Sequence, residues 1–296
     1  NKGECEYLFM NSFYSLSGAM GNMYNEVRTL ASSRQPVMIK GEPGTGKEQI
    51  ARFLYLNSSL SNKPFVLINC ELVNEKSWDF LLNHYNSPLN ATGNTIYFQN
   101  IEGLTEECIL KLMAAIQETG LSRRVRLLFS CVCRDGEPAP DVMRRFCSRL
   151  GCIILNLPSL RSRSDEIPAL ANLYISSLKE ETGNQISGFE PKALEMLRQY
   201  DWPNNYTQFK HVLQTLATTT SAYIRSNIVA ELLSRERFLR RGAQTAGSQT
   251  NGDCTLEEII GQAVQQAVAA HNGNRAAAAR QLGISRTTLW RYLGKA

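Results

Sequence analysis

The sequence predicts an α/β fold built on a parallel β-sheet, followed by a small all-α domain and a C-terminal all-α helix-turn-helix unit. Three observations support it. Strand-like and helical segments alternate up to about residue 160, a glycine-rich loop joins an early strand to a helix, and the rest of the sequence is helical. Alternating strands and helices are typical of a parallel sheet with helices on both faces. A length of 296 residues is enough for two or three domains.

The expected strands are short apolar runs separated by helical segments. The first strand lies in PVMIKG, immediately before the glycine-rich loop. Helical spacing of apolar residues marks 18–34, and a further helix is expected at 106–119. Strand-like runs follow the loop at 64–70, 94–100, 125–131 and 151–158.

The loop GEPGTGK is typical of loops that bind phosphates. Gly41, Gly46 and Lys47 have the spacing G-x-x-x-x-G-K, between a strand and a helix. Glycines let consecutive backbone N–H groups point inward, the helix N-terminus adds partial positive charge, and the lysine reaches the outer phosphates. The alternative is a tight strand-helix turn with an incidental lysine. The expected nucleotide-binding residues are Gly41, Glu42, Pro43, Gly44, Thr45, Gly46, Lys47 and Glu48.

The strand NTIYFQN ends in two amides, Gln99 and Asn100. A strand of this kind, downstream of a phosphate loop, normally ends in acids that hold magnesium and activate water. An amide can hydrogen-bond to water, but it supplies no negative charge to hold a metal ion and accepts no proton. The sequence therefore indicates binding of a ligand with impaired hydrolysis.

The pattern changes again after the expected sheet. Residues 161–241 are expected to form a helical domain packed on the α/β domain of residues 1–160. Residues 242–253, GAQTAGSQTNGD, are small and polar without apolar periodicity, which is typical of a linker. A separate helical unit then occupies 254–296.

The tail NRAAAARQLGISRTTLWRYL is typical of a helix-turn-helix that binds DNA. Ser285 is a suitable N-cap for its second helix, whose first turn would enter the major groove. A helical hairpin with a solvated basic face is the alternative. The preceding helix, 255–271, carries an apolar stripe that a unit this small cannot bury alone, so a dimer is expected. The expected DNA-binding residues are Arg275, Arg286, Thr287, Thr288 and Arg291, with Arg280 and Lys295 as further phosphate contacts.

The charge of the chain is consistent with a polyanionic partner. The net charge is +5, the chain has no apolar run of 18 residues, and its first residues lack the order of a signal peptide. These features predict a cytoplasmic protein without a membrane segment. The eight cysteines form no CxxC pair, so reduced core thiols are expected, with a metal or redox cluster as the alternative.

Several segments together resemble the bacterial enhancer-binding proteins, AAA+ regulators that drive sigma-54 RNA polymerase and end in a Fis-type DNA-binding domain. They are PVMIKGEPGTGKEQIARFLYLNSS, KPFVLINC, LPSLRSRSDEIPAL, ALEMLRQYDWPNN and the tail GNRAAAARQLGISRTTLWRYL. The resemblance covers nearly the whole chain and includes Glu48 in the loop. It implies an AAA+ domain with a helical lid, a Fis-type tail, and a preceding sensory domain.

The departures from the family pattern affect its motor functions. Gln99 and Asn100 stand where the family has Asp-Glu, and residues 71–93 are too short to hold the GAFTGA loop that contacts sigma-54. The two sensor positions are Cys133 and Thr207 in place of asparagine and arginine. A trans-acting arginine finger is expected at Arg149, with Arg144 or Arg145 as a displaced second, and a solvated basic patch is the alternative.

These features predict a DNA-binding transcriptional regulator whose AAA+ domain binds a nucleotide without productive hydrolysis. ATP, ADP or a signalling nucleotide would fit the loop, and Mg²⁺ is left open. The expected partners are promoter or enhancer DNA, RNA polymerase carrying the housekeeping sigma factor, and further copies of the chain. The alternatives are an active ATPase that remodels sigma-54 polymerase, using Glu48, Glu102 or Glu106, and an interaction module whose tail binds DNA weakly.

Overall fold

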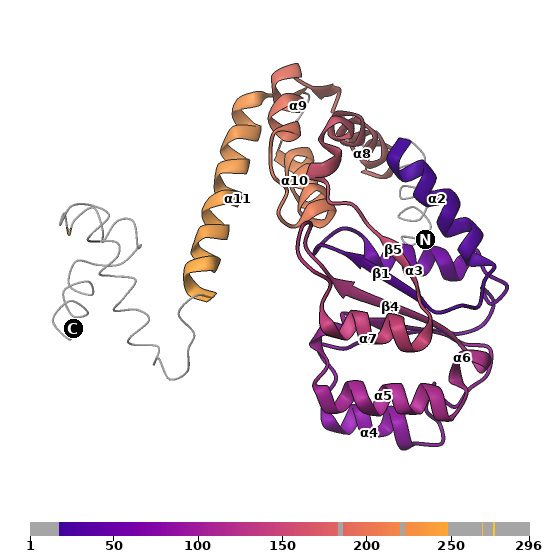
Figure 1. The fold of residues 1–296 in the computed structure, drawn as a ribbon. Coiled ribbons are helices and arrows are strands. Elements are labelled where there is room, and N and C mark those ends of the chain that lie inside the picture. The colour runs from indigo at the N-terminus through magenta and orange to yellow at the C-terminus, as the bar shows by residue number, and fades with distance from the viewer. Residues whose placement is uncertain (1–17, 183–185, 220–222, 248–267, 269–274, 276–296) are drawn as a thin grey trace. The chain divides into compact units, whose positions relative to one another are not determined.

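The computed structural model describes residues 18–182, 186–219 and 223–247, together with the single residues 268 and 275. The chain divides into two compact units between Leu233 and Ser234. The first unit contains a five-stranded sheet with its helices and a mainly helical part that follows it (Figure 1). The expected α/β fold with a helical lid is therefore confirmed.

The main sheet is entirely parallel, with the strand order β2-β3-β4-β1-β5. Gly41 at the end of β1 is paired with Val132 at the end of β4, and Asn69 is paired with Gln99. The carboxyl ends of these strands therefore share one edge of the sheet. The strands are β1 (Val37–Gly41), β2 (Phe65–Asn69), β3 (Thr95–Gln99), β4 (Arg126–Val132) and β5 (Ile153–Asn156), each within one residue of a predicted run or inside it.

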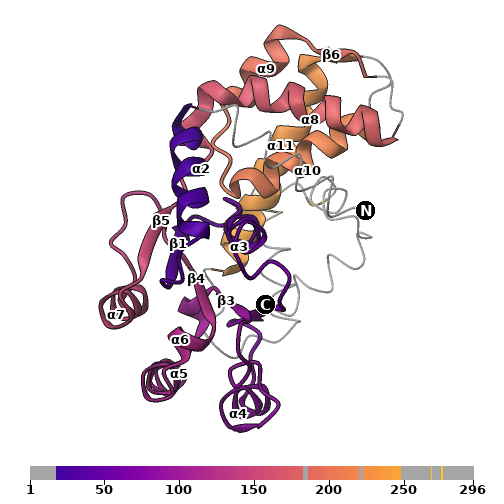
Figure 2. The same cartoon turned by 90° about the vertical axis from the view of Figure 1, so that its right-hand side faces the viewer.

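Helices cover both faces of the sheet. Because side chains alternate along a strand, Ile39 belongs to one buried cluster and its neighbour Met38 to the other. Figure 1 and Figure 2 show the two helical layers on opposite sides of the strands. The Ile39 face is covered by α2 (Gly18–Ala31) and α3 (Lys47–Leu56), and the Met38 face by α4 (Glu75–Asn83), α5 (Glu106–Glu118), α6 (Leu121–Arg124) and α7 (Asp141–Leu150).

A buried arginine joins the sheet to the ends of two helices. Arg126 begins β4 and is 1% exposed. Its guanidinium donates to the carbonyl oxygens of Leu30 (2.9 Å) and Ala31 (2.9 Å) at the end of α2 and of Leu54 (3.0 Å) in the last turn of α3. Burial lowers the pKa of Arg126 to about 10. Its positive charge satisfies the carbonyl groups that a helix C-terminus leaves without intrahelical partners.

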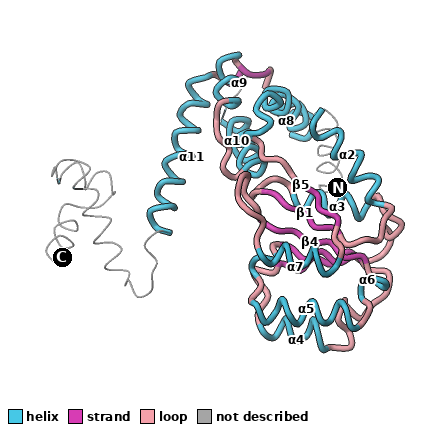
Figure 3. Tube along the Cα trace, viewed as in Figure 1, coloured by secondary structure: helices cyan, strands magenta, loops and turns pink. Residues whose placement is uncertain are grey.

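The lid packs around Trp202, which is fully buried and donates its indole N–H to the carbonyl oxygen of Leu197 at 2.8 Å. Tyr200 and Phe209 contact the Trp202 ring edge-on. Figure 3 shows this part as helices joined by loops. Its elements are η2 (Arg161–Glu166), α8 (Ile167–Thr182), β6 (Gly188–Phe189), α9 (Pro191–Arg198), α10 (Asn205–Thr219), β7 (Tyr223–Ile224) and the first part of α11 (Ser226–Gly247), whose residues from Ser234 onward belong to the second unit.

Two details differ from the sequence-based expectation. The segment 165–241 is not wholly helical, because β6 and β7 pair as a short parallel ladder, too short to show periodicity in the sequence. Residues 242–247, expected from their composition to lie in a linker, are helical, because α11 continues to Gly247. Adding a residue to an existing helix is far easier than starting one, and the alanines of this stretch favour it. The other domain boundaries stay predictions.

Some expectations lie outside the described residues. They include the helix-turn-helix residues Arg286, Thr287, Thr288 and Arg291, whereas Arg275 is described only as an isolated helical position. Within the described part of the chain, no helix is long and apolar enough to span a bilayer, and no cluster of three or more metal-ligating side chains occurs. The described cysteines are all free thiols.

Candidate functional site

The predicted phosphate loop connects β1 to α3. The strand ends at Gly41 and the helix begins at Lys47. Gly44 and Gly46 have φ angles of 74° and 93°, a conformation that side chains disfavour. Gly46 occupies the N-cap of α3 without a capping side chain. The first N–H groups of the helix therefore remain available to an anion, which confirms the strand-loop-helix context expected from the sequence.

Lys47 is directed back over the loop. It is 8% exposed, and its Nζ donates to the carbonyl oxygens of Gly41 (3.0 Å) and Glu42 (2.9 Å). Burial lowers the pKa of Lys47, and the negative charge of Glu102 is the largest of the contributions that raise it. Glu48 instead accepts hydrogen bonds from Arg52, one turn along the same helix, at 2.8 and 3.0 Å.

Glu42 fastens the loop to the lid. It is 4% exposed, and both of its carboxylate oxygens accept from Arg161 in η2, one of them at 2.8 Å. Asn205 in the lid donates to the same carboxylate at 3.1 Å and to the carbonyl oxygen of Pro43 at 2.9 Å. The N–H of Asp135 donates to Glu42 at 3.2 Å. These contacts, with Arg161 first, lower the pKa of Glu42 to about 2 against the opposing effect of burial.

The start of α10 lies directly against the loop. The N–H of Thr207 donates to the carbonyl oxygen of Gly44 at 3.2 Å. A Cβ atom added to Gly44 would lie 1.9 Å from the carbonyl oxygen of Asn204. Thr207, the expected second-sensor position, is therefore at the phosphate loop, where it contacts the loop through its backbone.

The other expected sensor position also borders the loop. The N–H of Cys133 donates to the carbonyl oxygen of Gly41 at 3.2 Å, immediately after β4. This contact continues the pairing of β4 with β1 past the end of the strand. The structure therefore places both expected sensor positions, Cys133 and Thr207, beside residues 41–44.

The two amides lie at the end of the strand, as the sequence predicts. Gln99 is the last residue of β3, and Asn100 is held in the left-handed region with φ 56°. The N–H of Asn100 donates to Ser130 Oγ at 3.1 Å, and the Tyr97 hydroxyl donates to the same oxygen at 2.9 Å. Asparagine adopts this backbone conformation more readily than other non-glycine residues do.

One carboxylate at this edge was singled out only weakly by the sequence. Glu102 lies in η1 (Ile101–Gly103), directly after β3. Its Oε1 accepts from the N–H of Val132 at 3.0 Å, while its Oε2 is buried and has no hydrogen-bond partner among the described residues. The spacing of the sequence does not show which of Glu102 and Glu106 is the better candidate. The structure favours Glu102, because Glu106 is exposed and pairs with Arg145.

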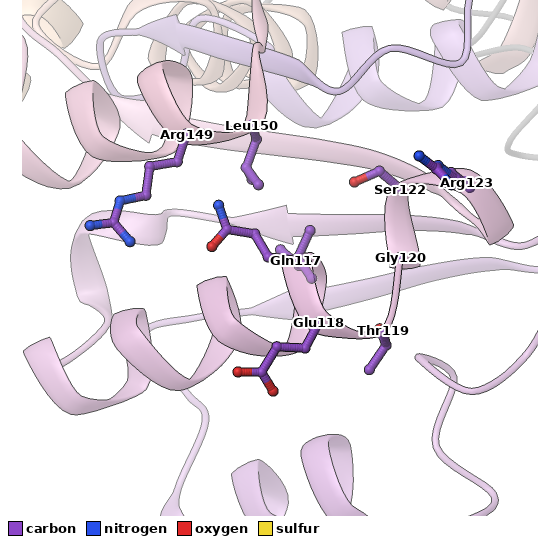
Figure 4. A pocket seen from close by; sticks show the side chains of 9 residues that line it. Gln117, Glu118, Thr119, Gly120, Ser122, Arg123, Arg149 and Leu150 are labelled. Atoms are coloured by element: carbon purple, nitrogen blue, oxygen red, sulfur yellow. The ribbon is translucent and has the colours of Figure 1, made fainter.

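Arg149 is placed apart from the loop. It lies in the last turn of α7 and lines a polar cavity of about 530 Å³ with residues of α5 and α6 (Figure 4). None of residues 41–48 lines that cavity. Arg144 and Arg145 are engaged by Asp141 and Glu106. Among the three candidate fingers in the described part of the chain, only Arg149 has no recorded hydrogen bond or ion pair.

Comparison with protein families matches three consecutive segments of this chain. A model of the sigma-54 interaction domain matches residues 13–82, one of the AAA+ ATPase lid domain matches 161–249, and one of bacterial regulatory proteins of the Fis family matches 255–295. The first match ends before Gln99 and Asn100. The Fis-family match covers the predicted DNA-binding residues.

Curated relatives align along almost the whole chain. Transcriptional regulatory protein ZraR of Salmonella typhimurium is 29% identical, with 94% of this chain and 67% of ZraR aligned. Alginate biosynthesis transcriptional regulatory protein AlgB of Pseudomonas aeruginosa is 28% identical over 94% of this chain and 66% of its own length. Anaerobic nitric oxide reductase transcription regulator NorR of Aeromonas salmonicida is 28% identical over 93% and 61%, respectively.

A solved structure shows the same fold. NtrX from Brucella abortus, crystallised in complex with ATP, superposes with a TM-score of 0.60 at 22% identity, covering 94% of this chain and 68% of NtrX. A second NtrX structure, in complex with ADP, has a TM-score of 0.61 at 20% identity. The likeness supports the arrangement of sheet and lid described above.

Proposed function

We propose that this chain, which belongs to the bacterial enhancer-binding regulators, controls transcription through a DNA-binding tail and an AAA+ domain that binds a nucleotide without productive hydrolysis. One contrast carries the proposal. The glycine loop and Lys47 form a phosphate cradle, whereas β3 ends in the amides Gln99 and Asn100. Binding requires the cradle, but hydrolysis also requires an acid that holds the metal and one that orients water.

ATP and ADP are the first ligands to test. The cradle recognises phosphates, so a signalling nucleotide with the same phosphate group fits it equally well. The NtrX structures that share this fold were solved with ATP and with ADP, which supports the choice of these two. The lid contacts at Glu42 and Gly44 offer a route by which a bound ligand could alter the position of the lid.

Nucleotide titration of the purified chain tests the binding claim. We expect saturable binding of ATP or ADP, and loss of binding in Lys47→Ala. Lys63→Ala is the matched control, because Lys63 is exposed and remote from residues 41–48 in the sequence. If the wild-type chain binds neither nucleotide and Lys47→Ala regulates DNA normally, the domain is a scaffold alone.

An active ATPase is the second candidate. It is favoured by the carboxylate of Glu102, whose charge acts on Lys47 at the edge of the sheet. A steady-state phosphate-release assay separates the two readings. Turnover above roughly 0.1 per second, which is within the range of slow enzymes, would overturn the non-hydrolysing proposal.

We infer that the chain does not act through sigma-54. Between β2 and β3 it forms α4, whose N-cap Asn74 accepts the N–H of Ser77 at 2.9 Å, and a short turn-rich segment. This leaves no room for a GAFTGA loop. In transcription assays we expect an effect on polymerase carrying the housekeeping sigma factor. Introducing Gln99→Asp and Asn100→Glu together should create no sigma-54 activation, because the contact loop would still be absent.

The tail would bind promoter or enhancer DNA in the bacterial cytoplasm. The Fis-family match covers residues 255–295, and the apolar stripe in the helix predicted from the sequence for 255–271 supports a dimer of tails. Contacts between AAA+ domains would add higher oligomers, with Arg149 as the residue that reaches a neighbouring copy. Footprinting on genomic fragments checks the DNA-binding claim, and a chain that protects no site would favour a weakly binding interaction module.

A further inference from the structure

The carboxylate of Glu102 lies at the same edge of the sheet as the phosphate loop. Its Oε1 accepts the N–H of Val132 at 3.0 Å, at the end of β4. Val132 is the register partner of Gly41, the residue at which the loop begins. Glu102 is therefore fixed at the same carboxyl edge of the sheet as the start of the loop, with β4 between them.

The second oxygen of this carboxylate is not balanced by a strong donor. Glu102 Oε2 is buried, and no N–H or O–H group of the described residues donates to it. The neighbouring donor is the thiol of Cys131, whose pKa is raised by burial first and then by the charge of Glu102 and a side-chain hydrogen bond to this carboxylate. A thiol is only a weak donor. A buried carboxylate oxygen without a partner is costly and calls for a ligand, water or ion.

The Glu102 carboxylate acts on Lys47, the positive charge that a phosphate in the loop would also use. Glu102 contributes more than any other charge to raising the pKa of Lys47 against the lowering effect of burial. Glu71 adds to the same negative field, and its side chain packs so closely that a Cβ on Gly103 would lie 2.8 Å from Glu71 Cγ. Lys47 therefore neutralises part of this acidic charge in the structure described here.

A phosphate that enters the loop changes this balance. The phosphate pairs with Lys47, which then neutralises the charges of Glu102 and Glu71 less. It also brings further negative charge to the same edge of the sheet. Like charges that lie close together repel, and a divalent cation between them removes the repulsion. Mg²⁺ in nucleotide sites is typically bound by one or two carboxylates together with phosphates, and it keeps several waters. The unbalanced oxygen of Glu102 fits this role.

We propose that Glu102 receives the Mg²⁺ ion of a bound Mg²⁺-nucleotide complex, in place of the acids absent at Gln99 and Asn100, so that the site selects Mg²⁺ complexes over free nucleotides. The inference rests on the nucleotide binding proposed above. It adds no hydrolysis, because one oxygen of Glu102 is held by Val132 and an amide still occupies position 100. Mg²⁺ would supply positive charge to the phosphates, and Glu102 would orient it.

Isothermal titration of the full chain with ADP and with ATP, in excess Mg²⁺ and in EDTA, tests the proposal. For the wild type we expect affinity about tenfold or more higher with Mg²⁺, which corresponds to about 1.4 kcal/mol. We expect Glu102→Gln to bind the Mg²⁺ complex more weakly than the wild type does, and to bind the free nucleotide more tightly. The ratio of the affinity with Mg²⁺ to the affinity in EDTA therefore approaches one.

The variants distinguish the loss of the Glu102 charge from a loss of the folded structure. Glutamine keeps an oxygen that can accept the N–H of Val132, and thermal unfolding checks that Glu102→Gln is folded. Glu106→Gln is the matched control, because Glu106 is exposed and pairs with Arg145 at the surface. It should keep the wild-type ratio, and Glu71→Gln should lower the ratio less than Glu102→Gln does.

Two outcomes would overturn the proposal, and they are distinguishable. A Glu102→Gln chain with the wild-type dependence on Mg²⁺ removes the role of Glu102 and leaves nucleotide binding intact. A wild-type chain that binds neither nucleotide, with or without Mg²⁺, removes the proposed function itself and this inference with it.

Discussion

The carboxylate of Glu42 in the phosphate loop accepts hydrogen bonds from both terminal nitrogens of the Arg161 guanidinium in the lid. The two residues are 119 positions apart in the sequence. Two parallel hydrogen bonds between an arginine and a carboxylate are stronger and geometrically more specific than a single one. Glu42 therefore couples the shape of the loop to the position of the lid.

Removing the charge of Glu42 should loosen the lid. We expect Glu42→Gln to lower the free energy of unfolding by about 1–3 kcal/mol at pH 7, because Arg161 loses a buried, charged acceptor. Urea denaturation measures this loss. Glu107→Gln, which breaks a fully exposed pair with Lys111, is the control and should leave the denaturation midpoint unchanged.

The Glu42 effect should depend on pH in a defined direction. Its pKa falls from 4.5 to about 2 on folding, so the charged carboxylate stabilises the folded chain above pH 4.5, and this contribution is lost as the pH falls toward 2. The difference between the wild type and Glu42→Gln should stay constant from pH 7 to about 5 and shrink below that. A difference that persists undiminished at pH 3 would contradict this assignment.

Gly44 should tolerate no side chain. A Cβ atom there meets the Asn204 carbonyl oxygen at 1.9 Å, and the φ of 74° disfavours any L-residue. We expect Gly44→Ala to cost about 2–4 kcal/mol of stability from clash and strain together. Gly136→Ala isolates the strain, because Gly136 has φ 83° with open space around it, and should cost about 1 kcal/mol. Equal losses would show that the lid is not docked on the loop.

Arg126 should be essential to the packing of α2 and α3. Arg126→Met keeps the apolar stem but leaves the carbonyl groups of Leu30, Ala31 and Leu54 without their donor. We expect a loss of about 2–4 kcal/mol by urea denaturation. Arg123→Met, at an exposed position three residues before β4 begins, should change stability by less than about 0.5 kcal/mol.

The backbone at Asn100 should favour a small residue over an acid. With φ 56°, Asn100→Gly should be neutral or stabilising, whereas Asn100→Glu should cost about 1 kcal/mol. Gln99→Glu, in the extended conformation of β3, is the control without this backbone penalty. Thermal unfolding of the three variants gives the comparison, and an equally stable Asn100→Glu would remove the conformational explanation.

Base recognition by the tail can be separated from phosphate contact. We expect Arg286→Ala to cost about 1–3 kcal/mol of binding free energy and to relax sequence choice, because this residue begins the predicted recognition helix. Lys295→Ala should weaken binding to all sequences similarly and lower the slope of the salt dependence by about 1. Footprinting and salt titration of both variants check the assignment, and identical behaviour would contradict it.

The strands and the loop were predictable because each depends on neighbouring residues. Apolar runs such as 94–100 and 125–131 fall within one residue of β3 and β4, and Gly44 and Gly46 of the loop have positive φ angles, which glycine adopts most readily. The short pair of β6 and β7 and the extension of α11 to Gly247 were missed. Both depend on pairing or helix propagation that leaves little local pattern.

By itself, the sequence determined the parallel sheet, the phosphate loop and the absence of acids at Gln99 and Asn100, because spacing and residue type are local properties. Only the tertiary structure decided which distant groups meet that loop. It joined Glu42 to Arg161 and set Asn204 against Gly44. It also distinguished Glu102, held at Val132 beside the loop, from the exposed Glu106. The physical reason is that strand register and lid docking act between residues far apart in the chain, and no local pattern records them.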